Sequence, residues 1–290
     1  MTRASQRRRV HRYTAEGGGT GRADTLAGEE PLEIRLDGRA FTVTMRTPGH
    51  DFDLVAGFLV SEGVVRAPDD IVRMDYRSGV GPDGQRTYNV VEVRLAPGVA
   101  PPDTSMERHV YTSSSCGVCG TASIEAVTKV SSFDPAGDPV RLPVTAVLAL
   151  PDRLRTGQKL FDTTGGVHAA GLFRFPGNPA GDGGTGQDAG EPELLCVRED
   201  VGRHNAVDKV VGWALRQGLL PLRSTVLQVS GRASFELVQK ASMAGVPALA
   251  AVSAPSALAV DLAEQTGVTL LGFSRGTSCN AYAHRERLVP

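Results

Sequence analysis

Alternating apolar and polar positions predict a small sheet with one helix in the first hundred residues. The predicted strands cover residues 32–36, 39–45, 71–76 and 88–95, and a helix with apolar side chains at helical spacing covers residues 50–63. Asp37 and Gly38 separate the first two strands, and an Asp-Gly pair in that position is typical of a tight hairpin turn. We therefore predict a small antiparallel α+β domain over residues 29–110.

Short apolar strands alternate with amphipathic helices from residue 193 onward. The strands are expected at residues 193–198, 224–229, 247–252 and 268–273, and the helices at residues 204–217, 234–244 and 256–266. A glycine closes each helix, namely Gly218, Gly245 and Gly267. This alternation predicts an α/β fold in which right-handed crossovers build a parallel-rich sheet covered by helices on both faces.

The remaining segments complete a four-part organisation. Residues 1–28 are rich in Arg, Gly and Thr and are expected to be a disordered tail. Residues 111–160 comprise a cysteine-bearing loop, a short helix from residue 121 and a helix over residues 144–160. Residues 161–290 form the α/β domain, which begins with a strand at residues 166–175 and carries a flexible Gly-rich insertion at residues 177–191.

Composition excludes several classes of partner. The 31 basic and 32 acidic side chains give a net charge of -1, so nucleic acid and anionic membrane surfaces are not expected partners. No apolar run approaches the roughly 18 residues of a membrane span. Arg7, Arg8 and Arg9 are not followed by the apolar region of an export signal. We therefore expect a soluble cytoplasmic protein.

Cys116 and Cys119 form a Cys-x-x-Cys pair among small residues. Such a pair serves as a redox couple, as half of a zinc site or as a sulfur carrier, and each role uses a thiolate. No second ligand pair has zinc spacing, so no intrinsic metal is expected. A redox pair normally opens a long helix after a strand, whereas this pair lies in a Ser-rich loop, which leaves thiol exchange open but not favoured. Cys196 and Cys279 stand in or beside apolar stretches and are predicted to be small buried side chains.

The predicted strand ends carry polar and cationic residues. Arg203, Arg232 and Arg275 each lie near a strand-end glycine, and the following helix N-termini add free backbone N–H groups. Because the carboxyl ends of parallel strands meet at one edge, these residues predict a binding site for a phosphate or nucleotide. His204 lacks the neighbouring glutamate of the zinc deaminases, so it is either a hydrogen-bonded structural residue or an anion contact.

Four segments give the chain a resemblance to the formate dehydrogenase accessory sulfurtransferases of the FdhD/NarQ family. They are residues 113–120 (SSSCGVCG), 164–171 (TGGVHAAG), 199–209 (EDVGRHNAVDK), and 230–234 (SGRAS) with 272–276 (GFSRG). The resemblance implies a cytidine deaminase-like three-layer sandwich without the zinc site. It also implies a protein that takes sulfur from a cysteine desulfurase and passes it to a cofactor with two nucleotide arms, and because of these two arms we expect a homodimer. The sulfur would pass to the bis-molybdopterin guanine dinucleotide cofactor of molybdenum or tungsten, for a formate dehydrogenase catalytic subunit.

The resemblance assigns roles to particular residues. Cys116 matches the persulfide-bearing cysteine, and Cys119 matches its assisting partner. The expected cofactor-binding residues are Gly272, Phe273, Ser274, Arg275, Gly276, Thr277 and Ser278, together with Asp200, Arg203, His204, Asn205, Ser230, Gly231 and Arg232. Two alternatives from other classes remain at this point, a cofactor-escorting chaperone without sulfur chemistry and a thiol-disulfide oxidoreductase.

Overall fold

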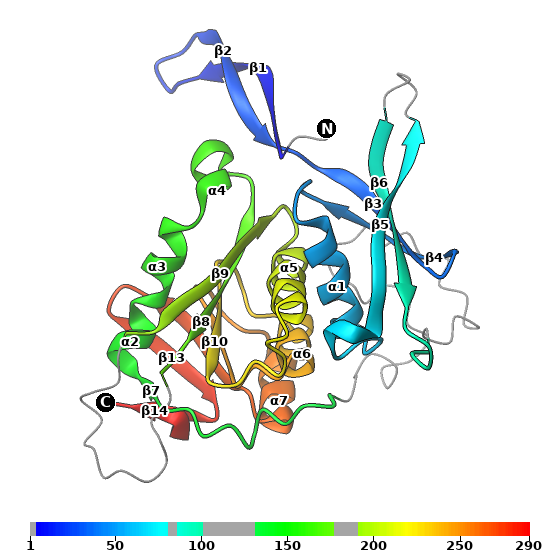
Figure 1. Ribbon diagram of the computed structural model, residues 1–290. Coiled ribbons are helices and arrows are strands. Elements are labelled where there is room, and N and C mark those ends of the chain that lie inside the picture. The colour runs from blue at the N-terminus through cyan, green and yellow to red at the C-terminus, as the bar shows by residue number, and fades with distance from the viewer. Residues whose placement is uncertain (1–3, 81–85, 101–130, 177–190) are drawn as a thin grey trace.

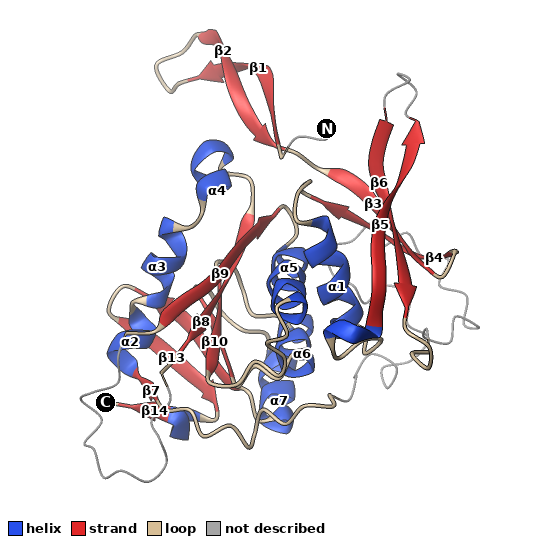
Figure 2. Cartoon of the chain, in the orientation of Figure 1, coloured by secondary structure: helices blue, strands red, loops and turns tan. Residues whose placement is uncertain are grey.

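The computed structural model describes residues 4–80, 86–100, 131–176 and 191–290. A six-stranded sheet with helices on both faces forms its centre, a four-stranded sheet lies beside one helical layer, and a two-stranded hairpin projects at the top of the view (Figures 1 and 2). Cys116, Cys119 and the helix expected from residue 121 lie outside the described residues, as does nearly all of the insertion at residues 177–191.

The central sheet mixes parallel and antiparallel strands. Its spatial order is β13 (Ser278–Ala283), β12 (Thr269–Arg275), β11 (Ala248–Ala251), β10 (Thr225–Val229), β8 (His168–Arg174) and β9 (Glu193–Asp200). Strands β10, β11 and β12 are parallel neighbours, but β8 pairs antiparallel with both β10 and β9, and β13 pairs antiparallel with β12. The parallel-rich sheet that we predicted is therefore corrected to a mixed sheet. The reason is that β8 and β9 pair as consecutive antiparallel strands, and β13 turns straight back from β12.

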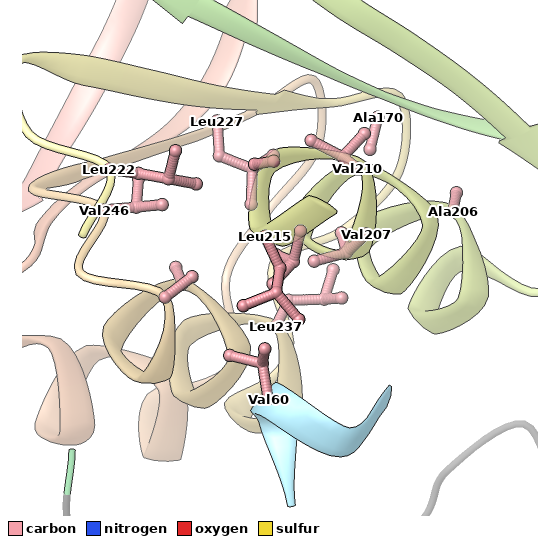
Figure 3. Close-up of a cluster of buried hydrophobic side chains, with 14 of the residues drawn as sticks. Val60, Ala170, Ala206, Val207, Val210, Leu215, Leu222, Leu227, Leu237 and Val246 are labelled. Carbon is pink, nitrogen blue, oxygen red and sulfur yellow. The ribbon is translucent and has the colours of Figure 1, made fainter. Parts of the chain in front are cut away.

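Alternate residues of the central strands face two separate cores. Leu227 and Leu270 belong to a core shared with α5 (Arg203–Arg216), α6 (Phe235–Met243) and α7 (Ala257–Thr266). Val226 and Leu271, one position away, belong to a core on the other face, shared with α2 (Val144–Leu148) and α3 (Leu150–Thr156). Figure 3 shows the first core around Leu215 and Leu227. The period of two along each strand thus buries both faces of the sheet and produces three layers.

The helix expected over residues 144–160 is broken into short pieces. They are α2 (Val144–Leu148), α3 (Leu150–Thr156) and α4 (Lys159–Thr164). Pro151 stands in the first turn of α3, where its missing N–H costs nothing, and Gly157 ends that helix. The prediction of a single helix was therefore wrong, because Pro151 favours a new helix start within the segment and Gly157 ends that helix.

The smaller sheet has the order β4 (Arg39–Arg46), β3 (Glu30–Leu36), β6 (Arg86–Leu95) and β5 (Ile71–Val80), and α1 (Asp51–Ser61) packs beside it. Asp37 and Gly38 have φ values of 46° and 84°, as the predicted hairpin turn requires. Strands β3 and β6 are parallel, so this sheet is not wholly antiparallel as expected. Its core is continuous with that of α5–α7, and the two predicted domains share one apolar interior.

Four short elements lie outside these two sheets and their helices. Strand β7 (Leu142–Pro143) pairs with β14 (Leu288–Val289), and single turns of 3-10 helix occupy Pro68–Asp70 and Arg285–Arg287. Within the described ranges, no helix has the length and hydropathy needed to cross a bilayer.

Residues 5–27 form an antiparallel hairpin and correct the expectation of a disordered tail. Strand β1 (Ser5–Tyr13) pairs with β2 (Gly19–Ala27) over nine residues, and most of its side chains are exposed. Low apolar content predicted disorder because such a segment cannot form a core. Ladder hydrogen bonds join backbones and need no apolar side chain, and β2 also packs against α4.

Helices α1 and α5 touch through glycine. A Cβ atom on Gly57 would overlap the carbonyl oxygen of Asp208, and one on Gly212 would overlap the carbonyl oxygen of Asp53. Only residues without a side chain let the two backbones approach this closely. The contact joins the small sheet and α1 to the central sheet.

We predict that Gly57→Ala destabilises the whole chain, because the added methyl group must push α1 and α5 apart. The expected loss is about 1–3 kcal/mol of unfolding free energy, measured by urea titration. Gly166→Ala is the matched control, since its added Cβ has ordinary contact distances of 3.6 and 3.8 Å. Equal stability of the two variants would contradict the proposed contact.

Candidate functional site

A pocket of about 600 Å³ opens at the edge where β9, β10, β11 and β12 end. Because β8 runs antiparallel to β10, its first residue, His168, lies at the same edge. The lining includes Ser230 after β10, Val252 after β11, and Arg275 and Gly276 at the end of β12. Helices α3 and α4 form the opposite wall. We call this cavity the strand-end pocket.

Three of the predicted binding residues, Ser230, Arg275 and Gly276, line the strand-end pocket. The sequence reasoning missed Arg155, Gln158, Phe161 and His168, which also line it. His168 lies within residues 164–171, one of the segments that carried the family resemblance, so a signal for it existed. The others come from α3, α4 and the residue between them, whose sequence carries no binding motif.

Strained backbone holds Arg275 at the pocket. Phe273 has a φ of 50°, which is rare for a bulky residue, and the β12–β13 pairing shifts register between Gly272 and Arg275. The Arg275 guanidinium lies 5.8 Å from the centroid of the Phe273 ring. Strain of this kind concentrates at functional sites, and here it occurs in the segment predicted to bind cofactor.

Of the other residues in that segment, some are buried and some are exposed. Gly272 is buried, and a Cβ there would lie 2.8 Å from Pro255 Cδ and 2.9 Å from the Tyr282 ring. Ser274 is fully buried, and its Oγ has no hydrogen-bond partner among the described residues. Thr277 is exposed in the turn that follows, and Ser278, the first residue of β13, is exposed as well. The structure thus brings one arginine and one glycine of the segment to the pocket wall.

Glu199 fixes α4 at the pocket. Its two carboxylate oxygens accept hydrogen bonds from the backbone N–H groups of Leu160 and Phe161, both at 2.8 Å. These amides belong to the first turn of α4 and have no helical acceptor of their own. Glu199, the residue before Asp200, therefore positions the part of the pocket wall that carries Phe161.

Asp200 and Asn205 lie next to the pocket but are used within the chain. Asp200 is fully buried, forms an ion pair with Lys209 at 2.7 Å and accepts a hydrogen bond from Thr47 N at 3.0 Å. Asn205 Nδ2 donates to Met45 O at 2.7 Å and to Asp200 Oδ1 at 3.1 Å. These groups join the end of β4 to α5, and neither side chain lines the strand-end pocket, so their predicted part in cofactor binding stays a prediction.

The first two residues of α5, Arg203 and His204, act electrostatically on His168. His168 is half-buried, and burial lowers its pKa, as do the charges of Arg203 and His204, against a smaller opposing effect of Asp200. Arg203 is partly buried, and its Nε has no partner among the described residues. Gly231 lies against the imidazole ring, since a Cβ there would be 3.5 Å from Nδ1 of His168. Arg232 is exposed and does not line the pocket.

His204 is oriented by the N-terminus of α6. Its Nε2 lies 3.3 Å from Ser234 Oγ and 3.6 Å from Glu236 Oε2. Burial raises the pKa of Glu236, but hydrogen bonds from His204, from its own backbone and from Ser234 outweigh this and lower the pKa to about 2. His204 is thus a hydrogen-bonded residue of the chain, one of the two roles that the sequence left open.

The described cysteines do not favour thiolate chemistry. Cys196 is 5% exposed, and burial raises the pKa of its thiol to about 12. Burial also raises the pKa of Cys279, which is partly exposed on β13. Cys196 is the small buried side chain that was predicted. In the described part of the chain, no three His, Cys, Asp or Glu side chains converge on a metal position.

The fold and the site together define a mixed α/β protein with arginine, histidine and serine around a strand-end pocket. The FdhD/NarQ family model matches residues 27–289, and the chain belongs to this family. It is 55% identical over 284 residues to the sulfur carrier protein FdhD of Mycolicibacterium paratuberculosis, with 98% of each chain covered. It is also 55% identical to the protein of that name from Streptomyces avermitilis, covering all of this chain and 97% of the other.

A solved structure shares the fold. It is the crystal structure of a putative formate dehydrogenase accessory protein from Desulfotalea psychrophila, with a TM-score of 0.68 and 24% identity. The match covers 99% of this chain and all of the other. At this identity the likeness supports the fold, and the family assignment rests on the family model and the closer relatives.

We predict that Glu236→Gln lowers the free energy of unfolding at neutral pH. The difference in this free energy between variant and wild type should disappear in acid. A folded-state pKa of about 2, below the ordinary 4.5, means that ionised Glu236 stabilises the fold above pH 4.5. This contribution is lost as the pH falls toward 2. Urea unfolding of wild type and variant across this range measures the difference. The exposed Glu264→Gln serves as control, and a loss in Glu236→Gln that did not change with pH would contradict the assignment.

Proposed function

We propose that this protein is a sulfur carrier for formate dehydrogenase maturation, with Cys116 as the persulfide-bearing residue. The single observation that carries the proposal is the Cys116–Cys119 pair in a chain of the FdhD/NarQ family, whose relatives at 55% identity are named sulfur carrier proteins. The strand-end pocket adds a cavity lined by Arg155 and Arg275, whose guanidinium groups suit an anionic acceptor.

In the proposed mechanism, Cys116 attacks the sulfane sulfur held on a cysteine desulfurase and leaves with it as a persulfide. The acceptor is the bis-molybdopterin guanine dinucleotide of molybdenum or tungsten, bound as a substrate. Attack of the Cys119 thiolate on Sγ of Cys116 releases the terminal sulfur as hydrosulfide, which becomes a ligand of the metal. The two thiolates supply the two electrons and form a disulfide, which a cellular dithiol then reduces.

The strand-end pocket is the proposed site for a guanine nucleotide end of this substrate. A volume of about 600 Å³ suits one nucleotide. Arg275 would bind phosphate through its guanidinium, with Ser230 and His168 as neutral hydrogen-bonding groups. Phe161 on the opposite wall, with the Arg155 guanidinium 5.0 Å from its ring centroid, adds an aromatic ring that a base can contact. The substrate has two nucleotide ends, so a homodimer that presents two pockets is part of the proposal. The recipient is a formate dehydrogenase catalytic subunit.

We predict that incubation with a cysteine desulfurase and cysteine adds about 32 Da, the mass of one sulfur atom, to the wild-type protein. The adduct should be absent in Cys116→Ala and present in Cys196→Ala, since the Cys196 thiol is buried. Intact-mass spectrometry under non-reducing conditions makes the measurement. Guanosine diphosphate binding without any adduct would instead support a cofactor-escorting chaperone. An adduct-free protein that exchanges disulfides and binds no nucleotide would support an oxidoreductase.

We predict that Arg275→Gln weakens guanosine diphosphate binding about 10- to 100-fold, because it removes charge-assisted hydrogen bonds to phosphate. Arg232→Gln is the matched control, since it removes an exposed arginine at the same sheet edge that does not line the pocket. Isothermal titration calorimetry compares the variants. Equal losses in both would show that the pocket is not the specific site.

A further inference from the structure

The β1–β2 hairpin begins at the rim of the strand-end pocket. A Cβ on Gly166, which lines the pocket, would lie 3.6 Å from Cβ of Ala27 at the end of β2. Strand β2 also packs against α4, the helix that places Phe161 in the pocket wall. From this base the hairpin extends away from the body of the molecule, above α4 in the view of Figure 1.

One face of the hairpin is cationic and aromatic. Alternate residues of a strand share a face, which places Arg7, Arg9, His11 and Tyr13 together. Their cross-strand partners are small, namely Thr25, Ala23, Gly21 and Gly19. The Tyr13 ring lies over Gly19, with its Cε1 2.8 Å from the position of a Cβ. Arg9 Nη2 and His11 Nε2 lie 3.5 and 3.7 Å from the same position on Gly21. We call this surface the basic face.

The basic face has no acidic counterpart. Among the described residues, neither Arg7 nor Arg9 forms an ion pair. The one ion pair within the hairpin, Arg22 with Asp24 at 3.7 Å, is on the opposite face. Residues 5–27 contain five arginines and two carboxylates, a net charge of +3 in a chain whose total is -1. Charge concentrated in this way on an exposed ribbon suits an anionic ligand.

The pocket is too small for the whole proposed substrate. A cavity of about 600 Å³ accommodates one nucleotide end, so the remaining pterin and phosphate groups must extend beyond the rim. Ser5 pairs with Ala27 at the rim, and Arg7 and Arg9 lie two and four residues after Ser5 along β1. At about 3.3 Å per residue they stand roughly 7 and 13 Å from the rim along the hairpin. An extended dinucleotide spans distances of this size.

We propose that the basic face binds phosphate groups of the part of the dinucleotide that extends out of the strand-end pocket. This inference rests on the proposed function, since it takes the pocket as the nucleotide site. The guanidinium groups of Arg7 and Arg9 would supply charge-assisted hydrogen bonds to phosphate, and His11 and Tyr13 extend the same surface toward the hairpin tip. The pocket thereby selects the nucleotide end, and the hairpin selects for a ligand longer than one nucleotide.

The test compares two probes on two matched double variants of the full-length protein. Guanosine diphosphate occupies the pocket alone, whereas diguanosine tetraphosphate also carries phosphates past the rim. Arg7→Gln with Arg9→Gln changes the basic face, and Arg8→Gln with Arg12→Gln removes the same charge from the opposite face of the same strand. We expect the first pair to weaken diguanosine tetraphosphate binding about tenfold or more and to change guanosine diphosphate binding less than about twofold. The second pair should change neither.

Other outcomes overturn the inference in distinguishable ways. Equal losses in both double variants would mean general electrostatic attraction. Unchanged diguanosine tetraphosphate binding, with loss of formate dehydrogenase activation in cells, would mean that the hairpin contacts an acidic protein. A wild-type protein that binds neither probe would instead refute the nucleotide pocket of the proposed function. Circular dichroism of each variant confirms that the fold is retained.

Discussion

The close contact of α1 with α5 constrains much of the chemistry at the strand ends. Because Gly57 and Gly212 let the two backbones touch, no side chains separate the helices and their polar groups must be satisfied across the joint. Lys209 of α5 is also buried, and its Nζ pairs with Asp200 and donates to the backbone oxygens of Thr47 and Glu199, which ties α5 to β9 and to the segment before α1. The buried Asp208 is satisfied in the same way by Lys240 and Ser61. The end of β9 is thereby fixed at the edge of the pocket.

This constraint explains why the most polar stretch of the sequence only partly forms the site. Residues 199–209 follow a strand and contain Glu, Asp, Arg, His, Asn and Lys, which is the pattern of a ligand-binding loop. In the fold, Glu199 holds α4 and Asp200 and Asn205 hold the segment after β4. A polar residue at a strand end lies in the same local sequence pattern whether its side chain binds a ligand or bonds to a segment about 150 residues away along the chain. Sequence spacing therefore located the sheet edge but could not distinguish the two uses.

Local periodicity predicted the elements better than their arrangement. The Asp37-Gly38 turn and the glycines after α5, α6 and α7 were identifiable because each needs a backbone conformation that few other residues adopt, and all have positive φ. The antiparallel insertion of β8 was not predictable, since apolar strands of either direction have the same pattern. The β1–β2 hairpin was missed because its pairing depends on the backbone and its side chains stay in solvent.

Helix α4 connects the separate parts of the site. Its first-turn amides are held by Glu199 of β9, its Phe161 faces the strand-end pocket, and its outer side supports β2 of the hairpin. The helix is too short to be stable alone, so its position depends on these contacts rather than on its own propensity. A shift of α4 would move the pocket wall and the base of the hairpin together. Ligand contacts at either place would therefore order both, and this would couple the proposed recognition of a nucleotide end in the pocket to the proposed recognition of phosphates on the basic face.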